Sequence, residues 1–309
     1  MKKRTHHKNL GPGDIVNIPD GTSRIRQIAT LAAHDPGQRG FSSQVKTQQL
    51  QPAAEALLAS TRVVITTGFC IRAAMIGEND GPPGALALAD ALSKLGKRVV
   101  FVTDRFSRRL LESGFEAYGM SIRIVELDQE QSVADGQILE LTETFQPSHV
   151  VAIERPGSAI DGHRYSMRGD ILDDLCPAAD SLLSPLGPRS FTTIAVGDGG
   201  NELGLGSLRD THWPHVTHGE KIFCVTSADF VIPSGISNWG AHALVAALSV
   251  LSGKPLMRPA GHESHVLDCL QAAGAVDGCT GRPETTVDGI SQKDYLSTLQ
   301  AMFQIACNS

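Results

Sequence analysis

Two carboxylates and an amide lie among closely spaced glycines in the segment Gly197-Asp198-Gly199-Gly200-Asn201-Glu202. The apolar, β-branched run before it predicts a strand that delivers a polar loop to the edge of a sheet. Glycines let a backbone approach a ligand closely, although they lose conformational entropy when the loop orders. Carboxylates in such a loop can transfer protons or hold a divalent cation. The loop is therefore a candidate catalytic or binding site.

The elements that must position this loop can be recognised from residue 62 onward, where short apolar runs alternate with helical patterns. That alternation is typical of a mostly parallel α/β sheet flanked by helices, and we expect a three-layer, Rossmann-like fold. We expect residues 1–45 to form an N-terminal extension and residues 46–309 a single α/β catalytic domain. The expected strands are 62–67, 98–103, 121–126, 149–154, 192–196 and 222–226, and the expected helices are 25–33, 50–60, 84–95, 106–118, 136–145, 239–251 and 292–306.

Polar motifs follow five of the six predicted strands. Because the carboxyl ends of parallel strands lie on one edge of a sheet, where open α/β folds bind ligands, we expect these motifs to share a pocket. The motifs are Thr66-Thr67-Gly68-Phe69, Asp104, Glu154-Arg155-Pro156-Gly157, the 198–202 loop and Ser227-Ala228-Asp229.

Two helix starts carry further polar residues. Asp80-Gly81 precedes the predicted helix 84–95, so Asp80 could cap that helix, and its free N–H groups could bind a carboxylate or phosphate. Ser237 and Asn238 are candidate N-caps of the helix that begins at Trp239. The indole of Trp239 could form a pocket wall or belong to the core.

Arginines cluster between residues 154 and 170, together with several acids that include Asp161. Arg155 and Arg168 suit recognition of a charged substrate, because a guanidinium group can bind a carboxylate through two hydrogen bonds. A surface network of salt bridges is the alternative interpretation of the same residues.

The composition excludes several classes of function. A formal charge of −6 and an isoelectric point near 6.0 argue against a nucleic-acid-binding surface. No apolar run approaches the length of a membrane helix, and the basic segment 1–8 lacks the apolar stretch of a signal peptide. Six scattered cysteines indicate reduced thiols and a cytoplasmic location. One of them, Cys70, could be a nucleophile, but a structural thiol is the favoured interpretation.

Nucleotide-binding motifs are incomplete. Glu202 occupies the position of the third glycine in a dinucleotide fingerprint, and Gly96-Lys97 is followed by Arg98 rather than by Ser or Thr. We therefore expect no nucleotide cofactor.

Taken together, these segments resemble the D-glutamate cyclase family of bacterial and mitochondrial proteins. The resemblance covers most of residues 60–290, with Ser166 where the family pattern has Asn. It implies a lyase (hydro-lyase) that dehydrates D-glutamate to 5-oxo-D-proline, with a requirement for manganese. The matching segments are Thr67-Gly68-Phe69, Asp80-Gly81-Pro82-Pro83-Gly84-Ala85, Val102-Thr103-Asp104, Glu154-Arg155-Pro156-Gly157, Asp161-Gly162, Met167-Arg168-Gly169, Gly197-Asp198-Gly199-Gly200-Asn201-Glu202 and Ser237-Asn238-Trp239-Gly240.

Given that reaction, the acids are candidates for proton transfer or for holding a divalent ion. Asp198 and Glu202 are the expected base and acid, or metal ligands together with Asp104, and Glu154 and Asp161 are further catalytic candidates; Asp80 could also hold the ion. Oxygen ligands favour Mn²⁺ or Mg²⁺ over zinc. The expected substrate-binding residues are Thr67, Gly68, Asp80, Gly81, Arg155, Arg168, Gly199, Gly200, Asn201, Asn238 and Trp239.

Other functions remain open at this point. The chain could be another α/β enzyme that acts on a small anionic or phosphorylated metabolite, which ATP-dependent turnover would reveal. It could also be a non-catalytic sensor of an amino acid or organic acid, which would be stabilised by a ligand without converting it. We further expect a symmetric homodimer, a small-molecule substrate, and no nucleic-acid or membrane partner; eukaryotic relatives would lie in the mitochondrial matrix.

Overall fold

A six-stranded parallel sheet runs through the computed structural model, which describes residues 20–37, 49–184 and 190–307. Its strands lie in the order β5-β4-β1-β6-β7-β8. A separate antiparallel pair follows β1. The strands are β1 (Arg62–Thr67), β2 (Cys70–Ile71), β3 (Ile76–Gly77), β4 (Arg98–Thr103), β5 (Ile124–Glu126), β6 (His149–Ile153), β7 (Thr192–Gly197) and β8 (Phe230–Pro233).

Helices cover both faces of this sheet. The strands are rich in valine, isoleucine and threonine, and successive side chains point to opposite faces, as the pleat requires. On β1, Val63 and Ile65 join the larger core, while Val64 joins the smaller one. The described helices are α1 (Gly21–Ala32), α2 (Leu50–Ala59), α3 (Pro82–Lys94), α4 (Arg105–Tyr118), α5 (Gln131–Phe145), α6 (Arg209–His212), α7 (Gly219–Ile222), α8 (Ser237–Ser252), α9 (Ala260–Ala272) and α10 (Gln292–Cys307).

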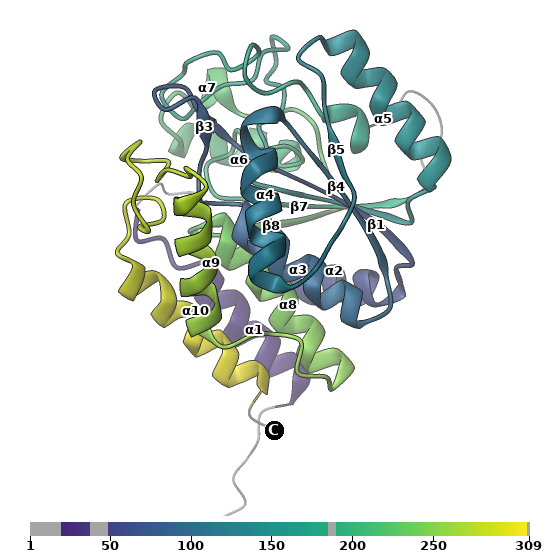
Figure 1. Ribbon diagram of the computed structural model, residues 1–309, viewed down its shortest axis with the longest axis vertical. Coiled ribbons are helices and arrows are strands. Elements are labelled where there is room, and N and C mark those ends of the chain that lie inside the picture. The colour runs from purple at the N-terminus through teal and green to yellow at the C-terminus, as the bar shows by residue number, and fades with distance from the viewer. Residues whose placement is uncertain (1–19, 38–48, 185–189, 308–309) are drawn as a thin grey trace, which may run out of the picture.

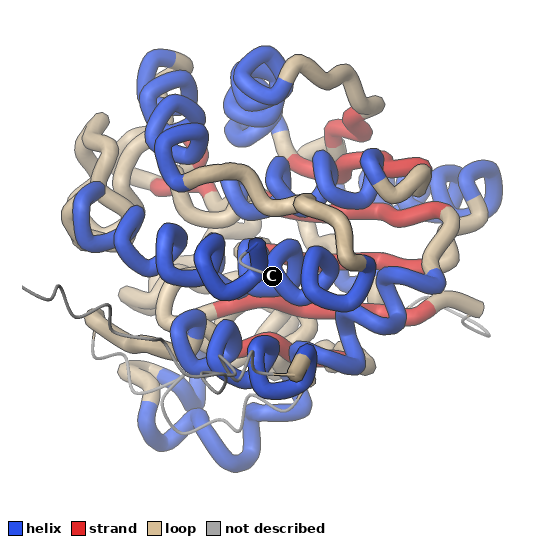
Figure 2. Tube along the Cα trace, turned by 90° about the horizontal axis from the view of Figure 1, so that it is seen from below, coloured by secondary structure: helices blue, strands red, loops and turns tan. Residues whose placement is uncertain are grey.

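The two helical layers differ in size. Residues of α1, α2, α3, α4, α8, α9 and α10 form the larger core with the sheet, whereas α5 packs on the opposite face. Figure 1 shows α3, α8 and α10 below the sheet and α5 above it. Seen from below, helices of the larger layer lie in front of the strands (Figure 2). The predicted three-layer α/β fold is confirmed.

Helix α8 lies at the centre of the larger layer and is buried on almost all sides, from Ser237 to Ser249. It contacts α1, α2, α3 and α10. Helix α1 belongs to the predicted N-terminal extension, yet its Ile25 and Ile28 are buried in the same core as α8. The predicted boundary at residue 45 and the basic segment 1–8 lie outside the described residues.

The prediction of a sixth strand at residues 222–226 is wrong. Ile222 ends the short helix α7, and Phe223 packs with it in a small core under the loops rather than entering the sheet. The sixth strand is instead β8, whose Pro233 lies at its end, where no further ladder hydrogen bond is required. Helix α9 is not among the predicted helices.

The strand order reverses between β1 and β6. Strands β4 and β5 extend the sheet on one side of β1, and β6, β7 and β8 extend it on the other. In open α/β sheets such a switch point leaves a crevice at the carboxyl ends of the strands, where ligands bind. None of the described helices is long and apolar enough to cross a membrane.

Candidate active site

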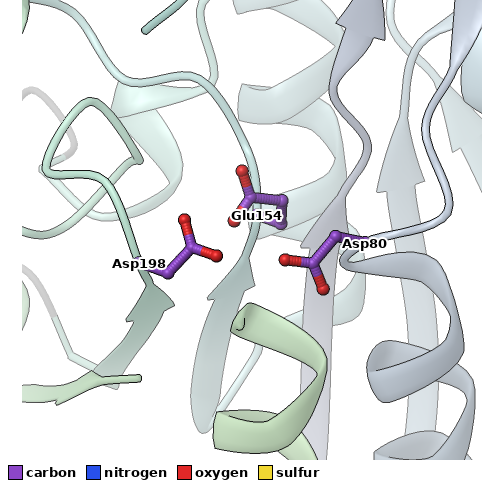
Figure 3. A group of neighbouring side chains, drawn as sticks. All are labelled: Asp80, Glu154 and Asp198. Atoms are coloured by element: carbon purple, nitrogen blue, oxygen red, sulfur yellow. The ribbon is translucent and has the colours of Figure 1, made fainter. Parts of the chain in front are cut away.

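Three buried carboxylates converge at this switch point (Figure 3). Glu154 follows β6, Asp198 follows β7, and Asp80 directly precedes Gly81 at the start of α3. One oxygen of each lies within 4.8 Å of the others, and the three residues are only 1–6% exposed. Because the three carboxylates are close together and buried from solvent, they require protons or a cation to offset their mutual repulsion.

Asp80 and Asn238 hold the starts of two helices through a reciprocal exchange of hydrogen bonds. Asp80 accepts from the backbone N–H groups of Ser237 and Asn238 at 2.9 and 2.8 Å, at the start of α8. The Oδ1 atom of Asn238 accepts from Gly81 and Gly84 at 3.0 and 2.9 Å, at the start of α3. Asp80, which precedes α3, therefore caps α8, and Asn238, in the first turn of α8, caps α3, whereas the sequence predicted a cap for each residue's own helix; Asp80 also accepts from Gly81 N–H at 3.0 Å.

Glu154 has an unusual backbone and an unusual acidity. Its φ of 44° is rare for a residue with a side chain. The Ser237 hydroxyl donates a hydrogen bond to its carboxylate. Burial, followed by the negative charges of Glu202, Asp80 and Glu78, raises the pKa of Glu154 well above its ordinary value. The protonated form of Glu154 is thus favoured more than that of an exposed glutamate.

Glu202 holds the glycine-rich loop in place. Its carboxylate accepts from the backbone N–H groups of Asp198, Gly199 and Gly200 at 2.9, 2.7 and 2.7 Å. The prediction that the N–H groups of Gly199 and Gly200 bind a substrate anion therefore needs correction. Both groups donate to the Glu202 carboxylate instead. Through them, Glu202 fixes the position of Asp198.

A cleft of about 570 Å³ opens above the cluster. Glu154, Asp198, Asn201, Glu202 and Arg168, all candidates from the sequence, line it. Its lining carries six carboxylates and only two guanidinium groups, so an anionic substrate needs neutralising charge there. The lining residues are Phe69, Cys70, Ile71, Arg72, Ala73, Glu78, Glu154, Ser166, Met167, Arg168, Asp170, Leu172, Asp198, Asn201, Glu202, Thr217, Gly278, Cys279 and Asp288.

Arg155 and Asp104 require correction, because they form a fully buried ion pair away from the lining of this cleft. Arg155 also donates to the carbonyl oxygens of Gly68 and Pro177 at 3.2 and 2.8 Å. The second oxygen of Asp104 caps α4 by accepting from Phe106 at 3.0 Å and from Ser107 at 3.1 Å. The pair ties together the ends of β1 and β4, and neither residue is placed to bind substrate or metal.

Nine other candidates also lie outside the lining of the cleft: Thr67, Gly68, Asp80, Gly81, Asp161, Gly199, Gly200, Asn238 and Trp239. Asp161 is exposed and accepts a hydrogen bond of 2.6 Å from the Tyr165 hydroxyl, which lowers the pKa of its carboxyl. Trp239 is a core residue that stacks on Tyr295 with ring centroids 6.0 Å apart. Thr67 ends β1 and Gly68 follows it, and the Thr67 carbonyl accepts from the Thr103 hydroxyl at 2.7 Å.

Cleft residues that the sequence did not single out include Glu78 and Asp288. In the sequence, only its position two residues before Asp80 could have indicated that Glu78 belongs to the site. The sequence Val-Asp-Gly occurs at residues 276–278 and again at 287–289. Both copies lie beside the cleft, because Gly278 of the first and Asp288 of the second line it. Cys70 lines the cleft, but burial and then the charge of Asp104 raise its pKa to about 12, so it is a thiol rather than a nucleophilic thiolate.

The fold and the site define an α/β protein with a carboxylate-rich cleft at its topological switch point. Residues 28–303 match the family described as D-glutamate cyclase-like, C-terminal, and the chain belongs to this family. Over 258 residues it is 34% identical to a human protein named D-glutamate cyclase, mitochondrial, and the match covers 74% of this chain. The chain spans only 39% of the length of that relative.

Proposed function

We propose that this chain catalyses the intramolecular dehydration of D-glutamate to 5-oxo-D-proline. The observation that carries the proposal is the buried cluster of Asp80, Glu154 and Asp198 at the edge of the cleft. Membership of the D-glutamate cyclase-like family and the printed name of the human relative support the same reaction.

The reaction forms a bond between the α-nitrogen and the γ-carbon and releases one γ-oxygen as water. The nitrogen loses two protons, and both end on the departing oxygen. The reacting groups are tethered, so holding a folded conformer is worth an effective concentration of up to ~10⁵–10⁸ M. The chain must therefore bend the substrate, neutralise the γ-carboxylate and move protons.

Two of the cluster's carboxylates line the cleft and can move these protons. In this mechanism Asp198 takes a proton from the substrate ammonium, because its loop presents it at the cleft wall. Glu154, whose pKa is raised, delivers a proton to the departing oxygen and regains one from Asp198, whose oxygen lies within 4.8 Å. The second nitrogen proton passes to the same oxygen, which leaves as water. Asp80 remains fixed at the start of α8 and holds the cluster's geometry.

The cluster also fits a divalent cation. Its three buried oxygen donors are those that Mn²⁺ and Mg²⁺ prefer, and their negative charges would be balanced by such an ion. Asp80, Glu154 and Asp198 would hold it. When bound, the ion would neutralise and polarise the γ-carboxyl group of the substrate.

The test is a chiral chromatographic assay of the purified protein with D- and L-glutamate, with and without manganese. We expect 5-oxo-D-proline from the D-isomer, and we expect Asp198→Asn to abolish turnover while the protein stays folded. Asp161→Asn is the matched control, because Asp161 is exposed and outside the cleft lining. Near-normal turnover by Asp198→Asn would remove that residue from the mechanism.

The absence of product under every condition would refute the proposed reaction. A thermal-shift screen of small acids and phosphates would then separate the sensor from an enzyme with another anionic substrate. Stabilisation by an acid without its conversion would favour the sensor, and ATP-dependent turnover would favour the other enzyme.

A further inference from the structure

A buried carboxylate and a guanidinium group both lie against the segment 277–289 in the cleft wall, at neighbouring residues of that segment. Glu78 is 5% exposed yet lines the cleft, and a Cβ atom added to Gly278 would overlap its Oε2 atom. Arg168 donates a hydrogen bond of 2.9 Å to the carbonyl oxygen of Cys279. Opposite charges are therefore anchored on two consecutive residues, 278 and 279.

The segment 277–289, against which Glu78 and Arg168 lie, is held by hydrogen bonds to buried side chains. Asp277 is fully buried and accepts hydrogen bonds from the backbone N–H groups of Cys279, Thr280 and Gly289 at 2.7–2.9 Å. The Asn79 side chain, next to Glu78, donates to two carbonyl oxygens of the same segment, at residues 284 and 286. The contacts of Asn79 with residues 284 and 286 therefore keep Glu78 against the segment 277–289.

We propose that Glu78 binds the α-ammonium and Arg168 the α-carboxylate of the amino-acid substrate. An α-amino acid carries these two charges on one carbon, which matches an anion and a cation anchored on adjacent residues. Asp288 adds a second acceptor, because its Oδ1 lies 3.5 Å from the point that a Cβ atom on Gly278 would occupy. The inference rests on the proposed function, since it gives an orientation to the same substrate.

In the folded conformer that cyclises, this orientation brings the γ-carboxyl group to Asp198 and Glu154, which line the same cleft, and keeps the α-nitrogen beside it within reach of Asp198. The guanidinium of Arg168 has further N–H donors besides the one used on Cys279, and a carboxylate can accept two of them. The ammonium group has three donors, so Glu78 and Asp288 can both receive one. The head of the substrate is therefore held by the 277–289 segment, and its tail meets the carboxylate cluster.

The experiment compares three ligands on the full chain: D-glutamate, glutarate, which lacks the amine, and 4-aminobutyrate, which lacks the α-carboxylate. Dissociation constants are measured by calorimetry for the wild type, Glu78→Gln and Arg168→Gln. The wild type should prefer D-glutamate to both analogues. Loss of one charge-assisted contact should weaken D-glutamate binding about 10- to 100-fold.

The pattern of losses is the decisive readout. Glu78→Gln should lose the preference over glutarate and keep the preference over 4-aminobutyrate, and Arg168→Gln should do the reverse. The matched controls are Glu284→Gln and Arg282→Gln, which alter a surface ion pair of the same segment outside the cleft lining. Both controls should keep both preferences.

The subsite is refuted if Glu78→Gln and Arg168→Gln retain the wild-type ratios while the wild type still forms 5-oxo-D-proline. Failure of the reaction looks different: the wild type would bind D-glutamate with the expected preferences and make no product. If Glu78→Gln does not fold, Asp288→Asn takes its place, and it should narrow the preference over glutarate. An unchanged preference in that variant would also count against the subsite.

Discussion

Replacing Asn238 by alanine should destabilise the protein far more than the loss of one amide suggests. The Asn238 side chain is fully buried and makes three hydrogen bonds: it accepts from Gly81 and Gly84 and donates to the Asn79 carbonyl at 3.0 Å. Alanine would leave the buried Gly84 N–H and the buried Asn79 carbonyl without this partner, whereas the Gly81 N–H would keep its hydrogen bond of 3.0 Å to Asp80 Oδ1. Each such group costs about 1–3 kcal/mol, and loss of a helix cap alone costs about 1 kcal/mol.

The expected decrease in the free energy of unfolding is about 3–5 kcal/mol, allowing for partial relaxation. For a chain of this size that corresponds to a fall in Tm on the order of 10 °C. Turnover should fall as well, because the start of α3 carries Asp80 into the carboxylate cluster. Urea unfolding gives the stability, and the D-glutamate assay at a temperature well below the new Tm gives the activity.

Ser237→Ala is the matched control, on the same turn of α8. It removes the hydroxyl that donates to Glu154 but leaves both helix caps, so its cost should not exceed about 1.5 kcal/mol. The explanation would be refuted if both variants lost the same stability, or if Asn238→Ala melted within about 2–3 °C of the wild type, a shift on the order of 1 kcal/mol.

Two further variants test the packing away from the site. Gly136→Ala, in the middle of α5 with open space where the Cβ would lie, should stabilise the protein by about 0.5–1 kcal/mol, which urea unfolding can measure. Burial opposes the ionisation of Asp90, but hydrogen bonds from Arg258 and Lys94 outweigh it and lower the pKa of the carboxyl below 3.8. A lowered pKa adds stability above the unfolded value, and this stability is lost as the pH falls through the folded value. The stability advantage over Asp90→Asn should therefore be constant near pH 7 and shrink below about pH 4; an advantage that grew in acid would contradict this assignment.

The order and spacing of the apolar runs were enough to predict the sheet. Runs such as Arg62–Thr67 and Arg98–Thr103 are long, β-branched and followed by helical patterns, and the structure gives them the same bounds. The sixth strand could not be located because two short apolar runs, near residues 223 and 231, compete for that place. Only tertiary packing decides between them: Asp229 bonds to Thr193 of β7 at 2.8 Å and so fixes the second run beside the sheet.

Residue type predicted the site less well than apolar runs predicted the sheet, because a charged side chain can stabilise the fold or line the functional site. Arg155 and Arg168 look equivalent in sequence, yet one is buried against Asp104 and the other lines the cleft. Asp80 and Asn238 could each be assigned to a cap from sequence, but the exchange of caps requires Asp80 and Ser237, 157 residues apart in the chain, to meet in space. Such pairings follow from the fold and leave no local signal.

The negative charge of the cleft explains why the raised pKa of Glu154 occurs in a cluster whose carboxylates could also hold a metal ion. The proposed substrate has two carboxylates and would approach a wall that already carries six, so the wall must first lose negative charge. Glu154 offers two ways to achieve this, because the same burial and neighbouring charges that favour its proton would favour a cation among Asp80, Glu154 and Asp198. Proton and cation then compete for one position. Manganese should therefore bind more weakly as the pH falls. The pH then decides whether the γ-carboxyl group of the proposed substrate meets a protonated cluster or a cation-bound cluster.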